Sequence, residues 1–418
     1  MYIDRISIKN FKAISDCQID FVSGLNVLTG DNGAGKTSIL EAVALALGGF
    51  LAGIKGVGSK GIIQEDIHMS IKPMGTASAA IEYATPVEIE CRANLNDKPY
   101  MWKRVRNDET GNSRTRLENR AIEKFAQGLA NDPKAVLPLI SFQTAARSWQ
   151  TKRGDFGNAA KAYLNDRRCG YIGCLDYSMD VKSIRQWCLE MEVAAYQKNQ
   201  EISEYEAFKG IASVFMQKMN SLDKAPSIYY SRSLSEIVYR ENGKDMPVSY
   251  LSAGYQSLLW MIMDLAYRMA LLNPNENDLR QLPGIVLIDE LDMHLHPKWQ
   301  WNIVDAIKET FPNVQFITAT HSPIVIASCK HVNLIQLQED QKVTYLPGAY
   351  GFDVQDVLEF RQGSLGIARE LRGLADKFDE QLNCENYEAA RETFRIMQEK
   401  YGEDNTEVKK ASAELELF

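Results

Sequence analysis

Gly30-Asp31-Asn32-Gly33-Ala34-Gly35-Lys36-Thr37 is the stretch that decides the fold of this chain. It matches the pattern GxxxxGK[ST] in full and stands between two apolar segments, Leu25–Thr29 and Ser38–Leu47. This pattern requires the order strand, glycine loop, helix, because the curled loop backbone and the helix N-terminus together surround a phosphate. The sequence therefore predicts a nucleoside-triphosphate site on an α/β core.

Each residue type in the loop has a chemical reason to be there. Lys36 supplies a positive charge for the β- and γ-phosphates, and Thr37 supplies a hydroxyl for Mg²⁺. The glycines allow the backbone N–H groups to face the phosphate. The residues expected to bind the nucleotide here are Gly30, Asn32, Gly33, Gly35, Lys36, Thr37 and Ser38.

A second motif lies far downstream, where four apolar residues, Ile285–Ile288, are followed by Asp289 and Glu290. A continuous apolar run is typical of a buried parallel strand, and ligands bind at the carboxyl end of such strands. Asp289 is therefore expected to hold Mg²⁺, and Glu290 to act as the general base that polarises the attacking water.

The segment Leu251-Ser252-Ala253-Gly254 precedes a long apolar helix, expected over 254–272. A serine at a helix start is explained equally well as an ordinary N-cap. Its position shortly before the acidic strand favours a second phosphate-facing turn. Because the chain already has one phosphate loop, such a turn makes sense if it serves the nucleotide of another subunit.

These motifs together resemble the ABC ATPase superfamily, in the branch of the SMC, RecF and OLD proteins. The resemblance implies ATP and Mg²⁺ as cofactors and a homodimer, or a higher homo-oligomer, in which Ser252 and Gly254 cap the γ-phosphate in trans. It also implies that His321 is a switch histidine, that Asp292 belongs to an interface loop, and that Lys12 contacts the nucleotide. The resemblance further implies that Gln143, in Pro138-Leu-Ile-Ser-Phe-Gln143, senses Mg²⁺ and water, although an ordinary buried loop explains this segment equally well.

The expected fold class is α/β, an ABC-type P-loop core with an antiparallel β lobe, a helical insertion and C-terminal helices. The core is assigned to residues 1–60 and 235–345, and the lobe with the glutamine loop to residues 61–150. The helical insertion covers 151–234, and an acidic helical region covers 346–418. Residues 117–130 are read as a helix. Within the last region, residues 351–418 carry 9 Lys and Arg against 16 Asp and Glu.

Composition limits the remaining possibilities. The formal net charge is −8, and 45% of the residues are hydrophobic, as in globular proteins. No run reaches the roughly 20 apolar residues of a membrane helix, and the N-terminus has no apolar signal segment. Seven scattered cysteines favour reduced thiols. We therefore expect a cytoplasmic protein without membrane contact.

The sequence around His294, His296 and Trp299 is similar to that of stand-alone ATPases in bacterial anti-phage systems such as Septu. That resemblance implies a regulatory or sensor subunit controlling a separate HNH-type nuclease, with no nuclease activity of its own. The alternative is a RecF-like repair ATPase acting directly on DNA. Basic residues among aromatics in the lobe, with Lys103, Arg104 and Arg106 foremost, suit a phosphate backbone, although a solvated hairpin face explains them equally well.

Overall fold

The computed structural model describes residues 1–74, 78–144, 166–176, 180–274, 276–338, 341–362 and 368–415. The chain divides into two compact units, Met1–Gly351 and Phe352–Phe418. Residues 145–165, which include the start of the expected helical insertion, lie outside the described part.

A six-stranded sheet forms the core of the first unit, in the order β16-β15-β3-β14-β13-β9. Its five strands from β15 to β9 run parallel, and β16 pairs antiparallel with β15. Strands β9, β13 and β14 are buried along their whole length, because both faces of a parallel sheet are covered. The strands are β3 (Leu25–Gly30), β9 (Leu139–Gln143), β13 (Gly284–Ile288), β14 (Val314–Ala319), β15 (Asn333–Leu337) and β16 (Val343–Leu346).

A second, antiparallel sheet has the order β2-β1-β6-β7-β8. Burial alternates along β6, from Val87 to Leu95, so that one face packs inward and the other is more open. The strands are β1 (Tyr2–Phe11), β2 (Ile14–Asp20), β6 (Val87–Leu95), β7 (Lys98–Arg106) and β8 (Arg116–Glu118).

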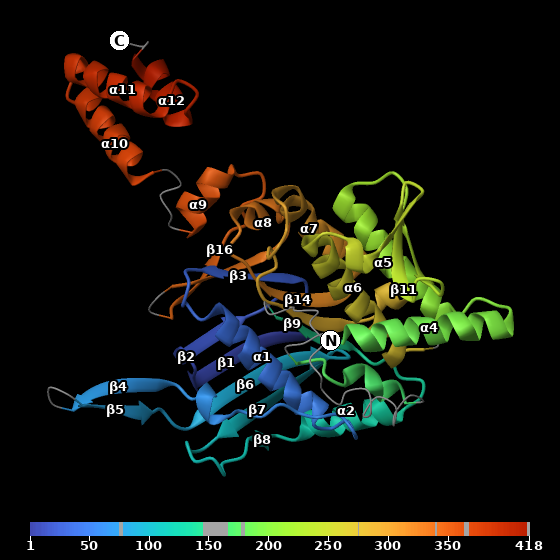
Figure 1. Cartoon of the computed structure of the whole chain (residues 1–418). Helices are drawn as coiled ribbons and strands as arrows, with labels where there is room; N and C mark the ends of the chain where they lie inside the picture. The colour runs from blue at the N-terminus through green and yellow to red at the C-terminus, as the bar shows by residue number, and fades with distance from the viewer. Residues whose placement is uncertain are drawn as a thin grey trace. The chain divides into compact units, whose positions relative to one another are not determined.

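Helix α1 (Lys36–Leu51) packs against both sheets (Figure 1). It contacts β1, β6 and β7 of the antiparallel sheet and β3, β13 and β14 of the core sheet. Nearly all its residues are buried, which fits its largely apolar sequence after the first turn. Trp102 Nε1 of β7 donates a hydrogen bond to the Ala46 carbonyl, 2.8 Å away. The helix that begins at the phosphate loop is thus fixed from two sides.

The other elements of the first unit surround this core. Helix α5 lies against both α6 and α7. The remaining helices are α2 (Ala121–Asn131), α4 (Val181–Lys198), α5 (Ser203–Asn220), α6 (Ala253–Leu272), α7 (Pro297–Thr310) and α8 (Pro323–Ser328). Two small antiparallel sheets consist of β4 (Met69–Met74) and β5 (Ser78–Tyr83), and of β10 (Ser227–Ser231), β11 (Glu236–Glu241) and β12 (Lys244–Pro247).

The second unit is helical and has a core of its own. Leu371, Phe378, Ala390, Met397 and Val408 are among the side chains buried there. Its helices are α9 (Val354–Gln362), α10 (Arg369–Asn383), α11 (Tyr387–Tyr401) and α12 (Thr406–Leu415).

The helix expected over 117–130 was placed too early. Residues Arg116–Glu118 form β8, which pairs with Lys103–Val105 of β7, and helix α2 begins only at Ala121. Backbone pairing with β7 outweighs the local helical pattern at this edge of the sheet.

Candidate nucleotide site

The phosphate loop connects β3 to α1 and depends on its glycines. Gly30, Gly33 and Gly35 have φ values of 141°, 86° and 94°, a region that other residues rarely adopt. At Gly30 a Cβ atom would also lie only 2.3 Å from the Leu337 carbonyl oxygen of β15. Conformation and space therefore both require glycine at the start of the loop.

Lys36 is folded back into the loop that it follows. Its ammonium donates to the carbonyls of Gly30, at 2.8 Å, and Asp31, at 2.7 Å. Burial lowers the pKa of Lys36, and the nearby carboxylates of Asp31, Asp289 and Glu290 oppose that shift. The positive charge therefore lies inside the loop, where the pattern predicts the β- and γ-phosphates.

Thr37 and Asp289, which are 252 residues apart in sequence, are in direct contact. Thr37 Oγ1 donates to Asp289 Oδ2 across 3.0 Å. A hydroxyl and one carboxylate side by side fit Mg²⁺, which is usually held by one or two protein oxygens plus substrate phosphates. Among the described residues, no group of three or more His, Cys, Asp or Glu forms an all-protein metal cage. The pair of Thr37 and Asp289 supplies two oxygen donors, the number that Mg²⁺ commonly takes from a protein.

Glu290 follows Asp289 at the carboxyl end of β13. Its backbone is left-handed, with φ of 47°, and its side chain is exposed. The next residue, Leu291, donates its N–H to the Ala319 carbonyl at the end of β14. The chain thus turns sharply after the buried Asp289 and presents Glu290 to solvent at the sheet edge.

Gln143 ends the neighbouring strand β9, in register with Ile288. Its carbonyl accepts the Asp289 N–H at 2.8 Å. Its side chain is buried, and Nε2 donates to Ser141 Oγ and Asp264 Oδ2, each 2.9 Å away. The residue expected to sense Mg²⁺ therefore adjoins the acidic strand end.

His321 follows β14, and its side chain is exposed. The residues on either side of His321 are held by side-chain hydrogen bonds. Thr320 Oγ1 donates to Asp292 in the loop after β13, and Ser322 Oγ donates to Gln300 Oε1 at 2.6 Å. The turn that carries His321 and the loop that carries Asp292 are therefore joined.

Ser252 is the N-cap residue of α6, yet its side chain forms no capping hydrogen bond to that helix. It is exposed. Gly254, two residues on, packs closely against the loop after β13, because a Cβ atom there would lie 2.7 Å from the His294 carbonyl oxygen. An N-cap interaction, which the sequence left open as an explanation for Ser252, is absent at this described residue.

Lys12 lies in a cluster of charged groups next to α1. Its ammonium forms an ion pair with Glu41 on α1, and a longer one, 3.5 Å, with Asp66. Glu41 is one turn beyond Thr37. Lys12 is therefore near the phosphate loop. To contact a nucleotide, its ammonium would have to leave these two carboxylates.

The predicted DNA contacts of Arg104 and Arg106 are wrong. Both side chains are buried, with exposures of 5% and 4%. Arg104 donates to the carbonyls of Leu45 and Lys60, and Arg106 donates to several carbonyls of the turn after β7. They brace the fold and are not available to a phosphate backbone. Lys103 is less buried and pairs with Glu88 and Glu90.

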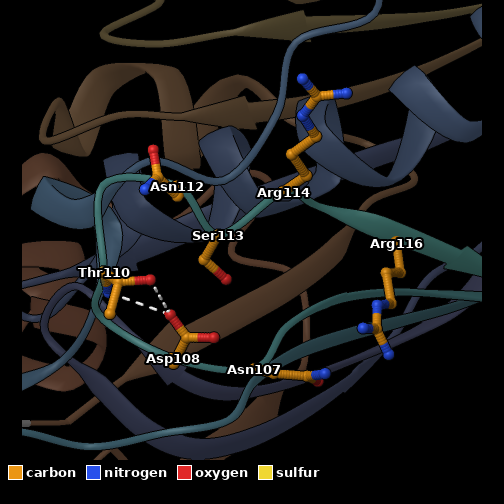
Figure 2. Close-up of a pocket in the computed structure, with 7 residues that line it drawn as sticks. All are labelled: Asn107, Asp108, Thr110, Asn112, Ser113, Arg114 and Arg116. Carbon is orange, nitrogen blue, oxygen red and sulfur yellow. Dashed lines mark hydrogen bonds between the residues drawn. The ribbon is translucent and has the colours of Figure 1, made fainter.

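The turn that Arg106 supports lines a polar surface pocket, together with Arg114 and Arg116 (Figure 2). Within it Asp108 accepts hydrogen bonds from the N–H and hydroxyl of Thr110. Arg114 and Arg116 at this pocket are exposed, whereas Arg104 and Arg106, which the sequence favoured, are buried. Arg147 and Arg153 of the same basic stretch lie outside the described residues.

Two residues next to the site escaped the sequence analysis. Asp264 and Arg268 are buried on α6 and form an ion pair at 2.9 Å. Their signal was present, since a carboxylate and a guanidinium four residues apart interrupt an otherwise apolar helix. Charged residues are seldom buried without a partner.

Together, the phosphate loop, the acidic end of β13 beside it and the serine turn at Ser252 define an ATPase of the AAA/SMC type. The chain belongs to the AAA domain family, whose model matches residues 5–221. A related model, AAA ATPase domain, matches residues 150–326.

Several curated relatives match most of the chain. The probable ATPase of retron Ec83 from Escherichia coli is 27% identical, over 85% of this chain and 74% of the relative. Septu protein PtuA from Bacillus thuringiensis is 26% identical, over 94% of this chain and 92% of the relative. The expected resemblance to the Septu group is confirmed.

The fold is similar to that of an SMC head bound to the C-winged helix domain of ScpA. The TM-score is 0.53 at 19% identity, covering 83% of this chain and 98% of the other. The expected fold class is thereby confirmed. Among the described residues, no helix combines the length and apolar composition needed to cross a bilayer.

Proposed function

We propose that this chain is a Mg²⁺-dependent ATPase that works as a head-to-tail homodimer and controls a separate HNH-type nuclease in anti-phage defence. In the dimer, the phosphate loop of one protomer holds ATP while Ser252 and Gly254 of the other close over the γ-phosphate. Each dimer then contains two composite sites.

The observation that carries the proposal is the position of Ser252 on α6. Asp264, on the same helix, bonds Gln143 beside the acidic strand end. At about 1.5 Å per residue, Ser252 lies ~18 Å along α6 from Asp264. Its exposed hydroxyl is thus far along the helix from its own protomer's Gln143. This separation supports a nucleotide supplied by a second protomer.

The remaining residues divide the chemistry among them. Lys36 and the loop N–H groups bind the phosphates. Thr37 and Asp289 are the protein oxygens that would hold Mg²⁺, and the amide of Gln143 would be a further contact for the metal and its water; the charge of Mg²⁺ would offset that of the phosphates. Glu290 accepts a proton from the attacking water, whose oxygen forms a bond to the γ-phosphorus as the bond to the β–γ bridging oxygen breaks. His321 at the sheet edge is suited to donate a hydrogen bond to the γ-phosphate.

Mixing two inactive variants tests the composite site. Lys36→Ala removes the charge of the loop, and Ser252→Arg blocks the serine turn. Each variant alone should lack turnover. In a mixed dimer one site combines the two intact halves, so mixing should restore about one working site per mixed pair.

A matched control is Ser233→Arg, which changes another exposed serine, in the turn between β10 and β11. It should leave turnover unchanged and should not restore the activity of Lys36→Ala beyond simple addition. Normal turnover by Ser252→Arg alone, or no recovery on mixing despite dimer exchange, would contradict the proposal.

The defence role draws its support from the relatives, an ATPase of a retron and a Septu protein, which match most of this chain. Co-expression with the product of the neighbouring reading frame tests it. We expect a stable complex with an HNH-type protein, and loss of phage protection when Lys36 is replaced by alanine. A neighbouring product without nuclease motifs, or protection independent of Lys36, would contradict it.

Direct action on DNA, as in a RecF-like ATPase, is less well supported. Two of the three lobe residues that favoured it, Arg104 and Arg106, are buried. We therefore expect ATP turnover to be unaffected by added DNA.

A further inference from the structure

Gln143 is held by a buried hydrogen-bond network that reaches it from helix α6. Its Nε2 donates to Asp264 Oδ2 at 2.9 Å, and the same carboxylate oxygen accepts from Arg268 Nε at 2.9 Å. Asp264 and Arg268 are only 3% and 7% exposed. Solvent therefore has little access to these bonds, and the low local dielectric strengthens them.

The Asp264 carboxylate determines the orientation of the Gln143 side-chain amide. A carboxylate only accepts hydrogen bonds, so the amide nitrogen must point at Asp264. The second hydrogen bond of the same nitrogen, to Ser141 Oγ, reinforces that orientation. With the nitrogen engaged twice, the amide oxygen is the end left for a cation or a water molecule.

Asp264 is itself prevented from rotating. Arg268 pairs with it and also donates to the carbonyls of Gly170 and Ile172, at 3.1 and 2.9 Å. The backbone carbonyls therefore hold Arg268 in place, Arg268 holds Asp264, and Asp264 holds Gln143. Gln143 in turn adjoins Asp289 through the main-chain bond described above.

We propose that Asp264 is a positioning residue of the ATPase site, which fixes the Gln143 amide so that its oxygen, and not its nitrogen, is presented to the metal–nucleotide complex. The inference rests on the proposed role of Gln143 as a Mg²⁺ and water contact. Without Asp264 only Ser141 Oγ still holds the amide, and because a hydroxyl can donate as well as accept, it does not by itself distinguish the amide nitrogen from the oxygen. Orientations that present N–H groups, which repel a cation, then become accessible.

A double-mutant cycle with Mn²⁺ as the probe tests this. Mn²⁺ binding is measured by electron paramagnetic resonance with a non-hydrolysable ATP analogue bound to the full chain. Gln143→Ala and Asp264→Ala should each weaken Mn²⁺ binding by about tenfold, the usual effect of losing one hydrogen bond to a charged group. Affinity for the metal-free nucleotide should stay unchanged. The double variant should be no weaker than the single ones, because Asp264 acts only through Gln143.

The outcomes separate the inference from the proposed function. If Gln143→Ala leaves Mn²⁺ binding intact, the role of Gln143 in the proposed function is wrong. If Gln143→Ala weakens binding but Asp264→Ala does not, or if the two losses add, only the positioning role is overturned. Asp245→Ala, which removes an exposed partner of Arg240, is the control and should bind Mn²⁺ normally.

Removing a buried ion-pair partner can prevent folding, so a second variant keeps the test decisive. Ser141→Ala removes the other acceptor of Gln143 Nε2 and leaves the pair of Asp264 and Arg268 intact. It should weaken Mn²⁺ binding in the same direction by about two- to fivefold. An unchanged Mn²⁺ affinity in this variant, together with a normally folded protein, would count against the network.

Discussion

Glu290 lies two residues beyond a fully buried strand, and its left-handed backbone turns the chain at the sheet edge. If it is the general base, Glu290→Gln should keep ATP bound while hydrolysis falls by about 10²–10⁴-fold. Phosphate release and equilibrium ATP binding measure the two effects separately.

The control for this variant is Glu385→Gln, which changes another glutamate with left-handed backbone, φ of 56°, in the second unit. It should hydrolyse ATP at the normal rate. Full turnover by Glu290→Gln would remove this residue from the mechanism.

Arg104 shows how a residue type can mislead when its surroundings are unknown. Burial lowers its pKa to about 10, and its guanidinium donates to two main-chain carbonyls and to Ser59 Oγ. Arg104→Gln should therefore destabilise the fold by about 3 kcal/mol, because it leaves buried acceptors unpaired. Chemical denaturation measures the loss.

Arg116→Gln, at the rim of the pocket in Figure 2, is the matched comparison. As an exposed substitution it should change the unfolding free energy by less than about 0.5 kcal/mol. Equal stability of the Arg104 and Arg116 variants would mean that Arg104 does not brace the fold.

For single residues, the sequence predicts the role of those that belong to a recognisable motif. Lys36 and Thr37 follow from the loop pattern, and the meeting of Thr37 with Asp289 follows from where parallel strands end. The hydrogen bond from Gln143 to Asp264 could not be predicted, because the two residues are 121 positions apart and share no motif. Arg104 and Arg106 were misjudged because charge alone does not distinguish an exposed strand face from a buried one.

Between elements, the close packing of α6 against the loop after β13 depends on Gly254. A methyl group there would lie 2.7 Å from the His294 carbonyl oxygen, which is backbone and cannot rotate away. Gly254→Ala should therefore cost about 1–3 kcal/mol and displace the serine turn. We expect ATP turnover to fall while ATP binding at the phosphate loop remains.

Gly210→Ala on α5 is the control, because it is an exposed helical glycine with open space around it. It should stabilise the protein by about 0.5–1 kcal/mol and leave turnover unchanged. Normal turnover in Gly254→Ala would show that the packing at this crossing is not needed for function.

The elements themselves were predictable where the pattern was strong. Strands β3 and β13 are short apolar runs flanked by glycine or carboxylates, and helix α6 is a long apolar segment. Strand β2 was missed because polar residues, including Asp16 and Gln18, interrupt it. Strand β8 was missed because its three residues are defined by pairing with β7, and pairing cannot be seen in a local pattern.

For the whole molecule, two units with separate cores imply two separable unfolding events. Phe378 is 1% exposed in the core of the second unit. Phe378→Ala should destabilise that unit by about 3–5 kcal/mol. ATP binding and the unfolding of the first unit should be unaffected, as calorimetry with and without nucleotide can establish. A single shifted transition for the entire chain would contradict this independence.

The position of β3 in its sheet sets a limit on how the protein is made. Its two neighbours are β14 and β15, which end at Ala319 and Leu337, and β15 also supplies the carbonyl that Gly30 packs against. A ribosome must therefore complete about three hundred further residues before the first phosphate-binding strand gains either partner. Until then β3 leaves the exit tunnel with both edges open, a state that invites aggregation. Nascent chains that stop short of residue 314 should accordingly be unable to retain ATP and should depend on chaperones.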